Sequence, residues 1–171
     1  MNDAIAFIGG GNMARSLVGG LVARGRDPAS IRVAEPVPPL RDALRHDFGV
    51  QVFDDGAEAV RDAATWVLAT KPQVLRAVCE GLAAQAQASR PLVVSIAAGI
   101  TAAQVERWLG GALPVVRTMP NTPALLGAGV TGLHATARVD GAGRTLAEGL
   151  LAAAGETVWI IVTSAVRTED D

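Results

Sequence analysis

The sequence predicts an α/β protein with a doubly wound, mostly parallel sheet and helices on both of its faces. Two observations carry this prediction. Short apolar runs, suited to buried strands, alternate along the 171 residues with stretches in which apolar residues recur at helical spacing. Half of the residues are hydrophobic and only 19% are charged, which is typical of one packed domain.

The first half of the chain predicts four strands, each followed by a helix. The run AIAFI at 4–8 is short and apolar, so it predicts a buried strand that ends at three glycines. A helix is expected at 12–24, because Met13, Leu17 and Leu21 then share one face. The alternation continues with strands at 31–34, 50–53 and 66–70 and with helices at 40–48, 57–62 and 73–88, the last of them preceded by Pro72.

The second half predicts the same alternation with a less regular end. Strands are expected at 92–96, 113–118, 129–133 and 157–163, and helices at 101–109 and 141–154. Thr101 is the expected N-cap of the first of these helices, since a hydroxyl can accept a bond from a free N–H of the first turn. Strands that alternate with helices at this spacing predict βαβ units with right-handed crossovers.

Composition excludes several functional classes. The net charge of −2 and a pI near 5.7 leave no basic surplus, so neither nucleic acid nor a membrane is an expected partner. The single cysteine, Cys79, allows no disulfide within the chain and fits a cytoplasmic location. Cys79 itself is expected to be a buried apolar residue. His46 and His134 are isolated from other ligand types, so no metal site is expected.

A glycine-rich turn follows the first predicted strand and opens the first predicted helix. The segment FIGGGNMA places Gly9, Gly11 and Ala14 in the spacing G-x-G-x-x-G/A. Gly9 permits a tight turn, Gly11 leaves room for a pyrophosphate, and Ala14 lets the helix pack closely on the strand. The turn therefore predicts a Rossmann-type domain that binds NAD or NADP through residues Gly9, Gly10, Gly11, Asn12, Met13 and Ala14.

Glu35 ends the second predicted strand, 24 residues after Gly11. In an NAD-binding domain an acidic residue near this place bonds the adenine ribose, and it would repel the 2′-phosphate of NADP. Arg41 is the residue that would reach a 2′-phosphate instead. The alternative is that Glu35 is a solvated loop residue before Pro36. The choice between NAD and NADP stays open at this point.

Three segments resemble the pyrroline-5-carboxylate reductase family. They are FIGGGNMA at 7–14, ATKPQ at 69–73 and RTMPNTPALLGAGVTGL at 117–133, and SIAAGI at 95–100 is also similar to that family. The resemblance implies that a reduced nicotinamide transfers hydride to the C=N carbon of 1-pyrroline-5-carboxylate, which gives L-proline. Two other readings remain: a non-catalytic NAD(P)-binding module, and part of a related β-hydroxyacid-type dehydrogenase.

The motif positions also add expected cofactor contacts. Ligands of open α/β sheets bind outside the carboxyl ends of the strands, where these segments lie. Lys71 precedes a proline and is therefore expected to be extended, with its side chain near a phosphate or ribose or in water. Small residues suit a nearby nicotinamide ring. The added cofactor contacts are Ala69, Thr70, Lys71, Pro72, Ala97, Ala98, Gly99 and Asn121.

The resemblance stops near Trp159. We expect a cofactor domain at 1–159 and a divergent tail at 160–171, without the family's helical domain for dimerisation and substrate binding. No catalytic residue is therefore assigned. A bound cofactor without a closed substrate pocket would be poorly oriented, so weak or absent reductase activity is expected of this chain alone. A homo-oligomer, weakened by the missing domain, is the expected assembly.

Overall fold

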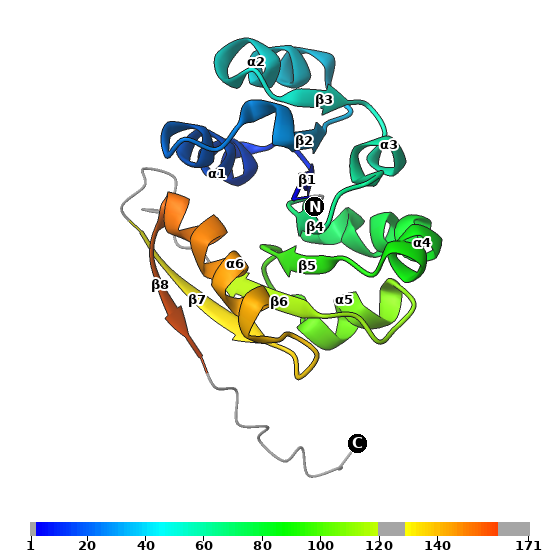
Figure 1. Cartoon of the computed structure of the whole chain (residues 1–171). Helices are drawn as coiled ribbons and strands as arrows, with labels where there is room; N and C mark the ends of the chain where they lie inside the picture. Colours follow the sequence, from blue (N-terminus) through cyan, green and yellow to red (C-terminus); the bar gives the residue numbers. More distant parts are fainter. Residues whose placement is uncertain (1–2, 120–128, 161–171) are drawn as a thin grey trace.

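The computed structural model describes residues 3–119 and 129–160, and these form one twisted eight-stranded sheet covered by helices (Figure 1). The strands lie in the order β3-β2-β1-β4-β5-β6-β7-β8. β7 is antiparallel to β6, and the other neighbouring pairs are parallel. The strand bounds are β1 Ile5–Ile8, β2 Ile31–Ala34, β3 Gln51–Phe53, β4 Thr65–Leu68, β5 Leu92–Ser95, β6 Val115–Met119, β7 Gly129–Ala135 and β8 Gly155–Trp159.

The helices connect these strands in the predicted order. Their bounds are α1 Asn12–Ala23, α2 Pro38–Phe48, α3 Gly56–Val60, α4 Pro72–Ser89, α5 Ala102–Trp108 and α6 Gly141–Leu151. Two short 3₁₀ turns, η1 Pro28–Ser30 and η3 Ala152–Ala154, complete the described elements. The predicted fold class is thereby confirmed, and each predicted helix and strand is present with ends shifted by a few residues.

The differences from prediction have local causes. The predicted helix at 141–154 ends at Leu151, and η3 follows it. The turn η1 was not predicted; it forms because the side chain of Asp27 accepts a bond from the Ala29 N–H. The last strand begins two residues before the predicted 157, and the rest of its predicted range lies outside the described residues.

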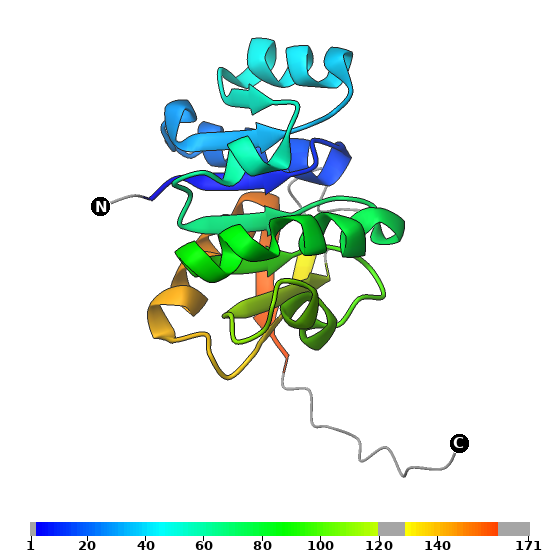
Figure 2. The same cartoon turned by 90° about the vertical axis from the view of Figure 1, so that its right-hand side faces the viewer.

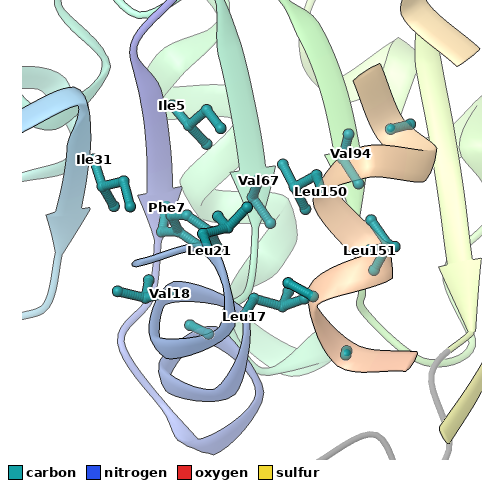
Figure 3. Packing of buried hydrophobic residues seen from close by; sticks show 14 of the residues in the cluster. Ile5, Phe7, Leu17, Val18, Leu21, Ile31, Val67, Val94, Leu150 and Leu151 are labelled. Atoms are coloured by element: carbon teal, nitrogen blue, oxygen red, sulfur yellow. The ribbon is translucent and has the colours of Figure 1, made fainter. Parts of the chain in front are cut away.

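Helices cover the sheet on both faces. α1 and α6 pack on one face, and α3, α4 and α5 pack on the other (Figures 1 and 2). Phe7 and Val67 of the central strands meet Leu17 of α1 and Leu150 of α6 in one buried cluster (Figure 3). A second buried cluster lies on the opposite face, beneath α4 and α5, and Trp66 is fully buried in it. Burial on both faces explains why the central strands read as unbroken apolar runs.

Local signals set the ends of the helices. Thr101 caps α5 as predicted, because its Oγ1 accepts a hydrogen bond from the Gln104 N–H. The Gln104 Oε1 in turn accepts a bond from the Thr101 N–H, which completes a capping box. Pro72 occupies the first position of α4, where its missing N–H costs no helical bond. α2 ends at Gly49, which has a φ of 72°. These ends place the loops that form the candidate site.

Several predictions outside that site can be compared with the structure. Cys79 is fully buried as expected, and burial of the thiol raises its pKa to about 12. Residues 3–119 and 129–160 contain no group of histidine, cysteine and carboxylate side chains arranged to hold a metal ion. The helices of this part of the chain are also too short or too polar to span a bilayer.

Candidate functional site

The site lies where the chain reverses the direction in which it builds the sheet. β1 has β2 on one side and β4 on the other, so the loops after β1 and β4 leave the sheet in opposite directions. Such a switch point opens a crevice at the carboxyl ends of the strands. Bonds from the Gly9 N–H to the Ala34 carbonyl (2.9 Å) and from the Ala69 N–H to the Ile8 carbonyl (2.8 Å) extend the strand pairing into these loops.

Gly9 makes the turn that leaves β1. Its φ is +107°, which side chains rarely tolerate, and a Cβ at this position would lie 2.7 Å from the Ala69 carbonyl oxygen. The space at Gly10 is also filled, because a Cβ there would lie 2.8 Å from Leu44 Cδ1. The backbone therefore requires a glycine at position 9, as the motif predicts, whereas a side chain at position 10 would displace the end of the Leu44 side chain.

Gly11 is different, because the space around it is open. A Cβ at Gly11 would meet no described heavy atom within 4 Å, and its φ of −71° suits any residue. Gly11 is the N-cap of α1 and provides no side-chain cap, so the first N–H groups of the helix face outward with the positive end of its dipole. This cradle fits the phosphates of a dinucleotide.

The helix that follows is oriented by its packing. Ala14 is 1% exposed and packs in the cluster shared with Phe7, so the helix approaches the strand closely as predicted. Asn12 is exposed and Met13 is half-buried. Both lie in the first turn of α1, beside the open space at Gly11.

The structure corrects one reading of Glu35. Its side chain is buried, not solvated: the residue is 6% exposed. Oε2 accepts a hydrogen bond from the Gly10 N–H (2.9 Å), and Oε1 accepts one from the Val37 N–H (3.0 Å). Glu35 therefore joins the end of β2 to the glycine turn. Arg41 donates from Nη1 to the Glu35 and Pro36 carbonyl oxygens (2.9 and 3.2 Å), which fixes the same loop.

A pocket of about 500 Å³ opens beside the turn. Its lining includes Gly9, Ala34 and Thr70, together with the apolar α4 residues Val74 and Val78. The hydroxyl oxygen of Thr70 is buried and has no hydrogen-bond partner among the described residues. An apolar pocket suits a flat heteroaromatic ring.

Two acidic residues of this pocket were not predicted from the sequence. Asp54 and Asp55 follow β3 and line the pocket, and the Asp55 side chain also accepts a bond from the Ala57 N–H at the start of α3. Their position after a predicted strand could have indicated a site, because parallel strands end at the same edge of a sheet. The sequence alone does not show, however, that β3 lies beside β2, at whose end Glu35 lies.

The remaining predicted contacts are at the same edge but differ in exposure. Lys71 is extended (ψ 144°) as predicted from the following proline; Lys71 and Pro72 are exposed, and Ala69 is half-buried. Ala97 is 3% exposed and packs in the core, while Ala98 and Gly99 are exposed. Asn121, with the rest of 120–128, lies outside the described residues.

Sequence comparisons place this geometry among known proteins. Residues 4–99 match the family model described as "NADP oxidoreductase coenzyme F420-dependent". The chain is 50% identical to a pyrroline-5-carboxylate reductase of Pseudomonas aeruginosa over 156 residues, which are 91% of this chain and 57% of that protein. It is 40% identical to the Vibrio alginolyticus enzyme of the same name, with 95% and 60% covered. The chain thus spans about three-fifths of the length of these relatives.

Solved structures give the same result. A pyrroline-5-carboxylate reductase from Coxiella burnetii superposes with a TM-score of 0.92 at 40% identity, covering 95% of this chain and 60% of that one. The Plasmodium falciparum pyrroline carboxylate reductase, solved with NADP bound, superposes with a TM-score of 0.81 at 21% identity and covers 94% and 58%. The second likeness shows the shared fold.

Proposed function

The chain belongs to the family of coenzyme F420-dependent NADP oxidoreductases, and from this premise we propose that it is the cofactor-binding part of a pyrroline-5-carboxylate reductase. One observation carries the proposal. At the switch point of the sheet, the uncapped start of α1 faces an open space at Gly11, which no part of the described chain fills. The named relatives supply the substrate class, 1-pyrroline-5-carboxylate.

We propose that the cofactor is NAD or NADP in its reduced form, which supplies the hydride that reduces the substrate C=N bond. The N–H groups at the start of α1 would hold the pyrophosphate. The pocket between β2 and α4 would hold the adenine. Ala98 and Gly99 are small and exposed, so they would let the nicotinamide approach the backbone.

The domain boundary and the activity are part of this proposal. Residues 1–159 would form the cofactor domain, and the two-fifths of the relatives that this chain does not match would close the substrate pocket. An exposed cofactor reacts slowly, because water competes and the two reacting rings are not aligned. We therefore expect the 171-residue chain to bind cofactor while reducing 1-pyrroline-5-carboxylate weakly or not at all.

The same proposal covers self-association. Met119, Val130, Val158 and Ile160 are each between 38% and 53% exposed. The strand register places Met119, Val130 and Val158 on one face of β6, β7 and β8, because Met119 and Val158 both pair with Gly132. The Ile160 side chain lies beside Gly132 on this face. An apolar face of this kind favours contact with another protein surface. We propose that it supports a weak homo-oligomer of this chain.

Titration with NADH, followed by fluorescence of the reduced nicotinamide, tests the cofactor proposal. We expect saturable binding with a dissociation constant between about 1 µM and 1 mM, the usual range for enzyme ligands. ADP-ribose should compete, because it carries the adenosine and pyrophosphate that the described site would hold. A flat titration with both NADH and NADPH at millimolar concentration would contradict the proposal.

A second assay separates the reductase from a non-catalytic binding module. The chain is mixed with 1-pyrroline-5-carboxylate and reduced cofactor, with and without a separately produced segment covering the unmatched part of the Pseudomonas aeruginosa relative. Proline formation that needs both pieces supports the cofactor domain of a reductase. Cofactor binding with no proline under either condition favours the module.

A further inference from the structure

One side of the proposed adenine pocket is formed by residues 51–60, which we call the β3–α3 segment. Asp54, Asp55, Gly56 and Ala57 of this segment line the pocket. The segment has little regular structure of its own, because β3 has three residues and α3 has five. A helix of this length is not stable in isolation, so contacts with other elements must hold it in place. α3 contacts β1, β2, β3 and α4 (Figure 1).

Arg32 of β2 binds the carboxyl end of α3. Its Nε donates to the Ala59 carbonyl oxygen (2.8 Å), and its Nη2 donates to the Glu58 carbonyl oxygen (2.8 Å). The last carbonyl groups of a helix have no N–H partner within that helix, so a side-chain donor is needed to pair them. One charged side chain therefore fastens the end of α3 to the central sheet.

The same guanidinium also holds β3. Its Nη1 donates to Gln51 Oε1 (3.1 Å), and its central carbon lies 4.4 Å from the centroid of the Phe53 ring. Gln51 and Phe53 are the first and last residues of β3, and Asp54 follows directly. Arg32 thus binds the elements on both sides of the pocket-lining loop. A planar guanidinium with five donors can reach all of these partners together, whereas the ammonium of lysine cannot.

Arg32 acts on the pocket from outside it. Arg32 is not among the lining residues, whereas Ala34, two positions further along β2, is one of them. Alternate residues of a strand face the same side, so both lie on the face of the sheet that α3 covers. Because the Arg32 side chain binds the β3–α3 segment, its effect on a ligand would pass through that segment.

We propose that Arg32 is a positioning residue for the adenine end of the cofactor, because it holds the β3–α3 segment where the adenine would contact it. The inference rests on the proposed function, which puts the adenine in this pocket. Removal of the guanidinium frees α3 from the sheet in a fraction of the folded molecules. Those molecules lack one side of the pocket and bind the adenine less tightly.

The affinity of Arg32→Met and Arg32→Lys for ADP-ribose, measured by competition with NADH, tests this proposal. Methionine keeps an apolar stem but has no donor. Affinity falls with the fraction of molecules whose site is in place, so we expect ADP-ribose to bind about threefold to tenfold more weakly to Arg32→Met. Lysine still donates to one carbonyl oxygen, so Arg32→Lys should lose only about twofold. All measurements are made well below the melting temperature of each variant.

Three comparisons separate positioning from a general loss of stability. Inorganic pyrophosphate has no adenine and would contact only the start of α1, so its affinity should not change in either variant. Hydrogen exchange should become faster at the amides of 57–60 and stay the same in α1. The matched control is Arg90→Met, which removes a guanidinium that donates to the Ala112 carbonyl oxygen beyond the pocket lining. It should leave both affinities unchanged.

The possible outcomes are distinct. Parent-like ADP-ribose affinity in the folded variants overturns the proposal and leaves Arg32 with a role in stability alone. If Arg32→Met does not fold, Arg32→Lys decides by itself. Equal weakening of ADP-ribose and pyrophosphate also overturns the proposal, because the effect would then lie at the glycine turn. Failure of the folded parent to bind ADP-ribose rejects the proposed function, and this inference with it. A graded loss confined to ADP-ribose supports both.

Discussion

Replacing Gly11 with valine is expected to weaken NADH binding by at least about 100-fold while leaving the protein folded. The added side chain would occupy the open space at the start of α1, where the pyrophosphate would lie. Charge-assisted bonds to free N–H groups contribute about 1.5–3 kcal/mol each, so the loss of two of them reaches this magnitude. The backbone is not strained by the change, because the φ of Gly11 is −71°.

The fold should tolerate Gly11→Val because no described heavy atom lies within 4 Å of the new Cβ. A valine is a poorer N-cap than glycine, so we expect the free energy of unfolding to fall by no more than about 1 kcal/mol. The matched control is Gly141→Val, which places valine in open space at the start of α6. Binding there should not change. If Gly11→Val bound NADH as tightly as the parent, the turn would not be the phosphate site.

The contrast between the glycines of the turn shows how far sequence reasoning reaches. The motif predicts that Gly9 is needed for the turn and that Gly11 is needed for the ligand, and the structure gives Gly9 a positive φ and a crowded Cβ position. The strands were predictable for a similar reason, since burial on both faces produces apolar runs that are visible in one dimension. Local rules of this kind depend only on neighbours in the chain.

The side-chain geometry of the site depends on neighbours in space. The sequence indicates that Glu35 ends a strand, but its bond to the Gly10 N–H joins residues 25 positions apart. The acidic wall at Asp54 and Asp55 becomes meaningful only when β3 is placed beside β2. The burial of Ala97 likewise depends on how α5 packs. No regular spacing of residues along the sequence indicates any of these contacts.

Gly20 is the position where helix propensity and packing give opposite predictions. Gly20 lies inside α1, and alanine is favoured over glycine in a helix interior by about 1 kcal/mol. In the structure, however, a Cβ at Gly20 would lie 2.5 Å from the carbonyl oxygen of Ala153 and 2.9 Å from its Cβ. These atoms belong to η3, which contacts α1. Neither backbone can move without disturbing the shared core.

Gly20→Ala is therefore expected to lower the free energy of unfolding by about 1–3 kcal/mol through overpacking, even after the gain in helix propensity. Denaturant unfolding and melting temperature check this, with a decrease of about 2–4 °C expected per kcal/mol in a chain of this size. Gly149→Ala is the control, since Gly149 lies inside α6 with open space around its Cβ. That variant should be more stable than the parent by up to about 1 kcal/mol.

The pair of variants tests the packing itself, because both make the same chemical change inside a helix. If Gly20→Ala and Gly149→Ala were stabilised equally, α1 would not be held against η3. Opposite signs mean that a contact between residues more than 130 positions apart positions the helix whose first turn faces the proposed phosphate site. In that case some Gly20→Ala molecules would remain folded with α1 displaced, and we expect their NADH affinity to fall together with their stability.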